Sequence, residues 1–228
     1  MNRRQVDLAG ALLSIGAIWT ILSIVVAESL TPGYNVSTEA MSGLGVPYFS
    51  GICNTIAACV TPIQPASAVF VFSAFLNGTF LILSGYILRR VTSHRLFGLA
   101  VAVWGVAQFL VGVSYIPIYL GAVSAGSVYA ARDLHAVVAY IIFVLPPTTA
   151  VSTYRFTKGP FKYFGVVLGV VALVALVLWR TGNDLGLGYG GMERMIVYPF
   201  ELWAIGFGAY LMGGFELDSV TSSVPTSP

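Results

Sequence analysis

The sequence predicts an all-α membrane protein, a bundle of six transmembrane helices with one long outer loop and both termini in the cytoplasm. Three observations lead to this fold class. The mean hydropathy is +0.86, and 57% of the residues are hydrophobic against 9% charged, which lies far outside the range of soluble domains. Six apolar stretches are long enough to cross a bilayer. Basic residues gather in alternate links between these stretches.

Each apolar stretch has roughly 20 residues, which at about 1.5 Å of rise per residue cross an apolar core about 30 Å thick. The first has the layout of a signal peptide, but its length favours a retained helix. Together the six use most of the chain, so residues 1–217 form one membrane domain. Residues 218–228 are polar and rich in Pro, Ser and Thr, which predicts a flexible cytoplasmic tail. The stretches are Leu8–Ala27, Ser67–Leu88, Leu96–Leu120, Leu134–Tyr154, Tyr163–Trp179 and Met195–Met212.

The basic residues predict the orientation of the bundle in a cell membrane. Eight of the eleven Lys and Arg residues fall at one set of helix ends, which the positive-inside bias assigns to the cytoplasm. They are Arg3, Arg4, Arg89, Arg90, Arg95, Arg155, Lys158 and Lys162. The net charge of +2 is too small to favour nucleic acid as a partner. We therefore expect membrane lipids, and other membrane-protein subunits, as partners.

The longest link, residues 28–66, lies on the predicted outer side. It combines apolar side chains with Gly and Pro, so we expect it to pack over the helix ends. Both cysteines, Cys53 and Cys59, fall in this loop, and on the oxidising side of the membrane a disulfide is favoured over two buried thiols. Two cysteines alone are too few for a closed zinc site, so no metal is expected.

Ionisable residues concentrate at the outer ends of the predicted helices. A charge at membrane depth costs at least about 2.5–3.5 kcal/mol, so such residues usually face the bundle interior and pair. The deepest carboxyl is that of Glu201, whose candidate partners are His135, Arg132 and Arg180. Arg194 lies on the same stripe of its helix, about 10.5 Å away. The candidate site consists of Arg132, Asp133, His135, Arg180, Glu193, Arg194 and Glu201.

Two interpretations of this cluster remain open. As a buried ion-pair network it would fix the register of the helices, and as a polar cavity beneath the loop it would bind an anionic or polar head group. No nucleophile is identified by its spacing, so no catalytic residue is assigned, although His135 is a candidate base. One histidine within the spans is too few for a bis-histidine haem, and no phosphate-binding glycine loop is present, so no cofactor is expected.

Short motifs spread along the chain resemble those of a known family. They are Tyr34–Gly45 (YNVSTEAMSGLG), Asp133–His135 (DLH), Gly191–Arg194 (GMER) and Glu201–Trp203 (ELW). These resemble the multi-pass family called domain of unknown function 998, which shows a Ser-x-Leu-Gly motif after its first span. It also shows a histidine at the start of a later span and a Glu-Arg pair before its last. The residues that match are Ser42, Leu44 and Gly45 for the first motif, His135 for the second, and Glu193 with Arg194 for the third.

This resemblance covers nearly the whole chain. The layout is also similar to the damage-regulated autophagy modulators and to the GPI-anchor remodelling membrane proteins, which have six spans and a polar first outer loop. The resemblance supports the six-span fold and adds Ser42 to the candidate site, but it implies no reaction. We therefore expect a lipid-binding module or an accessory subunit of a membrane complex. The alternative is a lipid-modifying enzyme that acts on head groups at the outer membrane face. Transport is less favoured, because no inverted repeat is visible.

Overall fold

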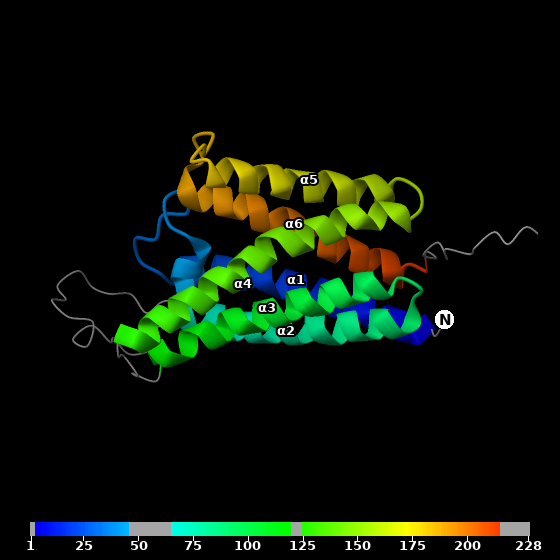
Figure 1. Ribbon diagram of the computed structural model, residues 1–228, viewed down its shortest axis with the longest axis horizontal. Helices are drawn as coiled ribbons and strands as arrows, with labels where there is room; N and C mark the ends of the chain where they lie inside the picture. Colours follow the sequence, from blue (N-terminus) through cyan, green and yellow to red (C-terminus); the bar gives the residue numbers. More distant parts are fainter. Residues whose placement is uncertain (1–2, 46–64, 120–124, 215–228) are drawn as a thin grey trace, which may run out of the picture.

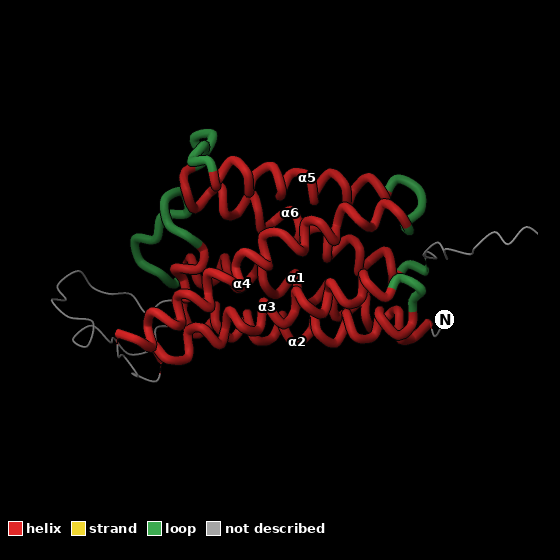
Figure 2. The backbone as a smooth tube through the Cα atoms, in the orientation of Figure 1, coloured by secondary structure: helices red, strands yellow, loops and turns green. Residues whose placement is uncertain are grey.

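The computed structural model describes residues 3–45, 65–119 and 125–214, and it confirms the all-α fold. Within these ranges six helices are long and apolar enough to span a membrane, and no strand occurs (Figure 1, Figure 2). The helices are α1 (Arg3–Ser29), α2 (Pro65–Val91), α3 (Arg95–Tyr119), α4 (Ala125–Ser152), α5 (Phe161–Arg180) and α6 (Gly188–Met212). The short 3-10 helix η1 (Met41–Gly45) lies between α1 and α2, and a second, η3 (Thr153–Arg155), follows α4.

The helices extend past the apolar stretches that predict them. The largest differences are in α4, which begins at Ala125 instead of Leu134, and in α6, which begins at Gly188 instead of Met195. Near a membrane, backbone N–H and C=O groups must be hydrogen-bonded, and a helix satisfies its own. The helices therefore continue beyond the apolar stretches into polar sequence. The charged residues of the candidate site on these two helices therefore lie inside the helices and not before them.

The six helices form a closed ring, in which each packs on its neighbours in sequence and α6 returns to α1. α4 crosses the bundle obliquely, starting beside α3 and ending beside α5 (Figure 1). The start of α1 and the end of α6 lie at the same end of the bundle, the right in Figure 1. We name this the basic end, because it also carries the basic residues of the α2–α3 and α4–α5 links. The opposite, loop end carries residues 30–45 and the α5–α6 turn.

Glycines allow α2 and α3 to pack closely. A Cβ added at Gly78 of α2 would lie 2.6 Å from the backbone nitrogen of Phe109, and one at Gly105 of α3 would lie 2.5 Å from that of Ile82. Real side chains do not tolerate such contacts, so only glycine lets the two backbones approach to this extent. Small residues at an interface are how membrane helices gain packing contacts in the absence of a hydrophobic driving force.

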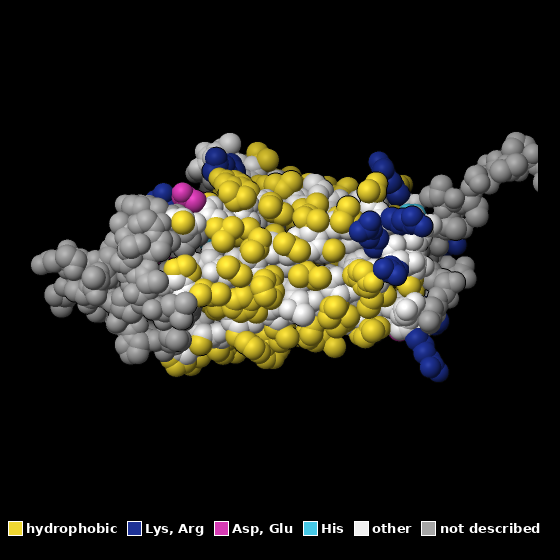
Figure 3. All heavy atoms as spheres, turned by 60° about the horizontal axis from the view of Figure 1, so that its bottom comes forward, with side chains coloured by type: hydrophobic (Ala, Val, Ile, Leu, Met, Phe, Trp, Pro, Cys, Tyr) yellow, Lys and Arg dark blue, Asp and Glu magenta, His cyan; other side chains and the backbone are white. Residues whose placement is uncertain are grey.

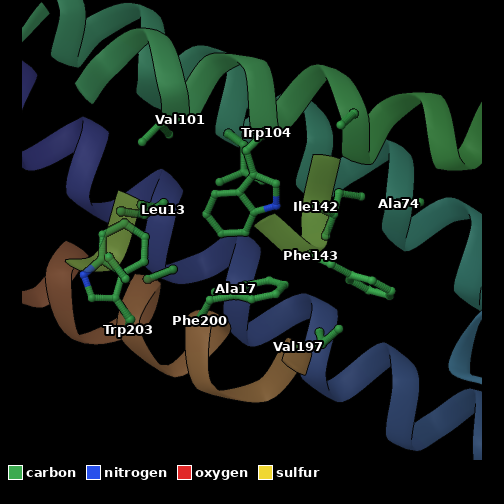
Figure 4. Packing of buried hydrophobic residues seen from close by; sticks show 14 of the residues in the cluster. Leu13, Ala17, Ala74, Val101, Trp104, Ile142, Phe143, Val197, Phe200 and Trp203 are labelled. Carbon is green, nitrogen blue, oxygen red and sulfur yellow. The ribbon is translucent and has the colours of Figure 1, made fainter. Parts of the chain in front are cut away.

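Aromatic side chains fill the interior of the ring from its middle toward the basic end. Trp104 of α3 and Phe200 of α6 point toward one another across the bundle, with ring centroids 5.6 Å apart (Figure 4). Trp203 stacks on Phe207 at 5.5 Å, and Phe97 of α3 packs edge-on against Phe207 at 5.1 Å. These large buried side chains separate the loop-end half of the interior from the basic end.

The outer surface agrees with a membrane-spanning bundle. Hydrophobic side chains cover the flank of the molecule in Figure 3, while most of the visible Lys and Arg side chains gather at one end of it. The described residues thus form a multi-pass membrane protein with an apolar belt and a basic end.

Candidate functional site

A cavity of about 70 Å³ lies in the loop-end half of the ring. Its walls come from α1, α2, α3, α4, α6 and η1, so nearly the whole ring contributes. A water molecule needs about 10–15 Å³ of such space, and the cavity therefore holds a few waters or one small polar group. Its polar and ionisable lining includes Thr20, Ser42, Gln108, His135, Glu193 and Glu201.

Two carboxyl groups reach the cavity from α6. Glu193 and Glu201 are eight residues apart, which separates them by about 12 Å along the helix. The Oε2 atom of Glu193 accepts a hydrogen bond of 2.6 Å from the backbone nitrogen of Met41, which fastens η1 over the cavity. Glu201 is 1% exposed, and its Oε2 atom has no hydrogen-bond partner among the described residues. Burial without a partner costs free energy, so the described residues leave this oxygen of the carboxyl unsatisfied.

The imidazole of His135 enters the cavity from α4. The Ser114 hydroxyl donates to the backbone oxygen of Val111 at 2.6 Å, which uses its only hydrogen. The 3.3 Å contact between Ser114 Oγ and His135 Nδ1 therefore requires the hydrogen to be on Nδ1. In the neutral imidazole with this tautomer, Nε2 carries the lone pair and can accept a proton or a hydrogen bond. Tyr115 packs edge-on against the imidazole at 5.4 Å and restricts its orientation.

The Ser-x-Leu-Gly motif forms η1 and covers the cavity. Ser42 lines the cavity, and its backbone oxygen accepts a hydrogen bond of 2.7 Å from the Tyr115 hydroxyl. Leu44 is buried, and a Cβ added at Gly45 would lie 2.6 Å from Cζ of Tyr115. The glycine is therefore required for close packing of η1 on the Tyr115 ring, while the serine is the member of the motif that reaches the cavity.

Arg194 does not line the cavity, and its guanidinium is hydrogen-bonded in full. Nε and Nη2 donate to Oε1 of Glu28 at 3.1 and 2.5 Å. Nη1 donates to the backbone oxygens of Val36 at 2.9 Å and Gly190 at 2.8 Å, and Nη2 also donates to the Tyr34 hydroxyl at 2.9 Å. Every N–H group of the side chain is thus used within the protein. The arrangement joins the end of α1, residues 34–36 and the start of α6.

Tyr34 extends this network into the segment before η1. Burial raises the pKa of the Tyr34 hydroxyl above its ordinary value, so the group stays protonated. It donates to the backbone oxygen of Ala40 at 2.9 Å while it accepts from Arg194. The backbone adds a further connection, because the Gly190 nitrogen donates to the Ser37 oxygen at 2.8 Å. Residues 34–41 are therefore fixed on the start of α6.

The other predicted site residues lie at the loop end but outside the cavity lining. Arg132 and Asp133 are exposed on α4 and pair with one another at 3.3 Å. Arg180, at the end of α5, donates to the Tyr140 hydroxyl of α4 at 2.7 Å. Of the three partners expected for the deepest carboxyl, only His135 shares its cavity. The structure therefore divides the predicted cluster into a cavity group, a buried ion pair and two surface contacts.

Sequence analysis missed two residues that hold Arg194, namely Glu28 and Tyr34. Glu28 was assigned to the loop, although an acidic residue that directly follows an apolar stretch is a natural partner for a deep arginine. Cys53 and Cys59 lie outside the described residues, so their disulfide stays a prediction. In the part of the chain that the structure describes, no group of three or more His, Cys, Asp or Glu residues could hold a metal ion.

Comparisons with known proteins bear on the family alone. Neither the curated proteins nor the solved structures include a match to this chain. A family of proteins of unknown function, DUF998, matches over residues 14–210, a range that includes every cavity residue named above. The similarity to autophagy modulators and GPI-anchor remodelling proteins stays a prediction. The match confirms the resemblance seen in the motifs, and the chain belongs to the DUF998 family.

Proposed function

We propose that the protein is a lipid-binding module of the cell membrane, and that its cavity takes a hydrogen-bond-donating group of a lipid head. The observation that carries the proposal is the carboxyl of Glu201, which is buried in the cavity with an unsatisfied oxygen. Ionisable residues inside a membrane are expensive, and they usually mark a functional site. A hydroxyl or amine that enters the cavity would supply the missing hydrogen bond.

The composition of the lining supports a donor and not an anion. The ionisable side chains in the cavity are those of Glu193, Glu201 and His135. The three arginines of the predicted cluster, which would suit an anionic head group, contact other parts of the protein. Carboxyl oxygens and the unprotonated nitrogen of a neutral imidazole accept hydrogen bonds, so the matching ligand presents N–H or O–H groups.

The position of the cavity supports a lipid as the source of that group. Apolar side chains form much of the remaining wall, including Ile24, Phe70, Ile142, Phe143 and Val197. The aromatic side chains below the cavity close the interior toward the basic end, which does not favour a transport path. In the proposed orientation both termini are cytoplasmic, and the cavity lies in the outer half of the membrane.

The test is mass spectrometry of the full chain, gently extracted from its native membrane, in wild-type form and as Glu201→Leu. We expect the wild type to retain one lipid class with an amine or hydroxyl head group, and the variant to lose it while staying folded. Glu201→Gln separates charge from hydrogen bonding: it keeps an acceptor, so a hydroxyl ligand remains and an ammonium ligand is lost. Asp133→Asn is the matched control, because it makes the same chemical change on an exposed carboxylate.

Two results of this experiment would contradict a lipid site in the cavity. If the wild type carries no enriched lipid, or if Glu201→Leu retains the same lipids, the cavity is not a lipid site. A stoichiometric set of other proteins without any such lipid would instead make the chain an accessory subunit.

A second candidate, a lipid-modifying enzyme that acts on head groups, is favoured by one observation. His135 lines the cavity, where Ser42 also lies, and a neutral imidazole can act as a general base. The retained lipid would then be converted by the wild type on prolonged incubation. His135→Gln would bind the lipid and leave it unchanged. A lipid that both proteins leave unchanged would argue against this candidate.

A further inference from the structure

A groove of about 380 Å³ at the basic end is lined by Tyr86, Arg89, Arg90 and Arg95. It lies where α2 ends and α3 begins, at the opposite end of the bundle from the cavity. Three of its four lining residues are arginines, and no acidic residue lines it. The groove takes no part in the function proposed above.

Close packing of the helices brings the arginines to one place. Only residues 92–94 separate α2 from α3, so the helices leave the link side by side. A Cβ added at Gly98 in the first turn of α3 would collide with the backbone nitrogen of Arg89 in the last turn of α2. Gly85 makes the reciprocal contact with Ala102. Because neither helix can be displaced without loss of this contact, Arg89, Arg90 and Arg95 are held beside the same groove.

Unlike Arg194, the arginines of the groove form no ion pair with a carboxylate of the described residues. The ion pairs that the described residues form are Arg3–Asp7, Arg132–Asp133 and Arg194–Glu28, and none of them belongs to the groove. Three like charges near one another raise the electrostatic potential between them, which an anion relieves. Arg90 lies over the ring of Tyr86, 4.8 Å from its centroid, which limits the orientations of that side chain.

The positive-inside bias explains why basic residues lie at this end of the bundle. It does not explain why three arginines line one groove. The α4–α5 link carries the same number of basic residues, Arg155, Lys158 and Lys162. There Lys162 lies over the rings of Tyr154 and Tyr163, and the neighbouring groove is apolar apart from Lys158 and Tyr210. The chain therefore contains a second set of basic residues that satisfies the same positive-inside bias without a shared groove.

We propose that the groove at the α2–α3 link binds the phosphate group of an anionic phospholipid head. Guanidinium groups match phosphate oxygens through paired N–H donors, which makes arginine the side chain best suited to this anion. The groove lies at the ends of two membrane-spanning helices, where the phosphates of a bilayer would lie. Basic pockets between transmembrane helices bind anionic head groups in this way. The same chemistry would admit a free phosphate compound, and the experiment separates the two sources.

The test uses the full chain in lipid nanodiscs of phosphatidylcholine with or without phosphatidic acid. Native mass spectrometry reports how strongly each protein retains phosphatidic acid over phosphatidylcholine. We expect R89Q/R90Q/R95Q to lose about 100-fold of this preference, at roughly fivefold for each arginine. The matched control, R155Q/K158Q/K162Q, removes the same charge at the same end and should retain most of it. Equal losses in both variants would mean general attraction to the basic end and would overturn the proposal.

Two further measurements complete the test, one with a lysine variant and one with soluble phosphate compounds. R89K/R90K/R95K preserves charge and topology, so it remains informative if the glutamine variant does not fold. We expect the lysine variant to lose most of the preference for phosphatidic acid, because lysine lacks the paired N–H donors of arginine. Full retention of this preference would show that positive charge alone is sufficient. In phosphatidylcholine discs, glycerol 3-phosphate and inorganic phosphate test the soluble source. Binding of these compounds that matches or exceeds that of phosphatidic acid would contradict a lipid as the natural ligand.

Discussion

The guanidinium of Arg194 in α6 binds the carboxylate of Glu28 at the end of α1, with Nη2 2.5 Å from Oε1. The two residues are 166 positions apart, and both side chains are largely buried. Because α1 and α6 close the ring, this pair joins the first and last helices at the loop end. The remaining N–H groups of the arginine bind backbone oxygens and a hydroxyl. The pair is therefore a structural contact that helps to position η1 over the cavity.

Loss of one partner of this pair should destabilise the protein strongly. Arg194→Ala and Glu28→Ala each leave a buried group without its partner, for which we expect a loss of about 3–5 kcal/mol in the free energy of unfolding. Thermal unfolding in detergent measures the change. Arg132→Ala is the control, because its exposed pair with Asp133 contributes at most about 1 kcal/mol. Similar losses in all three variants would show that the buried pair is not special.

Glu193 should control how firmly η1 covers the cavity. Its carboxyl accepts the backbone hydrogen bond of Met41, and a buried donor left without its acceptor costs about 1–3 kcal/mol. In Glu193→Ala we expect the Met41 amide to exchange its hydrogen roughly 10- to 100-fold faster, read by hydrogen exchange with mass spectrometry. Glu193→Gln retains an acceptor oxygen and should change exchange little. Unchanged exchange in the alanine variant would mean that other contacts hold η1.

The helices could be predicted from the sequence because a run of apolar residues long enough to cross a bilayer has few other stable structures. Their starts could not be predicted equally well. Helix α4 begins nine residues before its apolar stretch, at Ala125 instead of Leu134, since the hydropathy signal ends where the polar residues begin but the backbone hydrogen bonding does not.

The sequence predicts at which helix ends the candidate site lies, but not which of its residues contact one another. Spacing along one helix placed Arg194 on the stripe of Glu201, which favoured one shared polar site. The structure instead directs the arginine to Glu28, because α6 packs on α1 and that contact is not encoded in the spacing of either helix. The ionisable side chains that remain in the cavity are those of Glu193, Glu201 and His135, and the three arginines of the predicted cluster lie outside its lining.

Close packing of α2 on α3 should depend on glycine at position 85. A Cβ there would collide with the backbone nitrogen of Ala102, so Gly85→Ala must displace one helix from the other. We expect a loss of about 1–3 kcal/mol in unfolding free energy, as for other overpacked sites. Gly43→Ala is the matched control, since nothing lies within 4 Å of a Cβ at that position. If the two variants are equally stable, the packing is looser than the structure indicates.

Asn77 should be replaceable with a gain in stability. It is fully buried in α2, and neither its Oδ1 nor its Nδ2 atom has a hydrogen-bond partner among the described residues. Leucine has the same branched shape and the same number of side-chain heavy atoms, none of them polar, so Asn77→Leu should raise the free energy of unfolding by about 1–3 kcal/mol. Gly16→Ala, which places a Cβ 2.5 Å from the Asn77 Oδ1, should instead lower it.

A loss of stability in Asn77→Leu would mean that a water or a ligand satisfies the amide in the membrane. The variant Asn77→Leu/Gly16→Ala distinguishes these cases from a steric effect. If leucine is harmful because it clashes with α1, the added alanine makes the loss larger than the sum of the two single losses, because both groups occupy the same space. If leucine is harmful because it removes a hydrogen bond of the amide, the two losses add. The interior polar groups would then belong to a hydrated core, and the unsatisfied oxygen of Glu201 would be explained by water before any lipid.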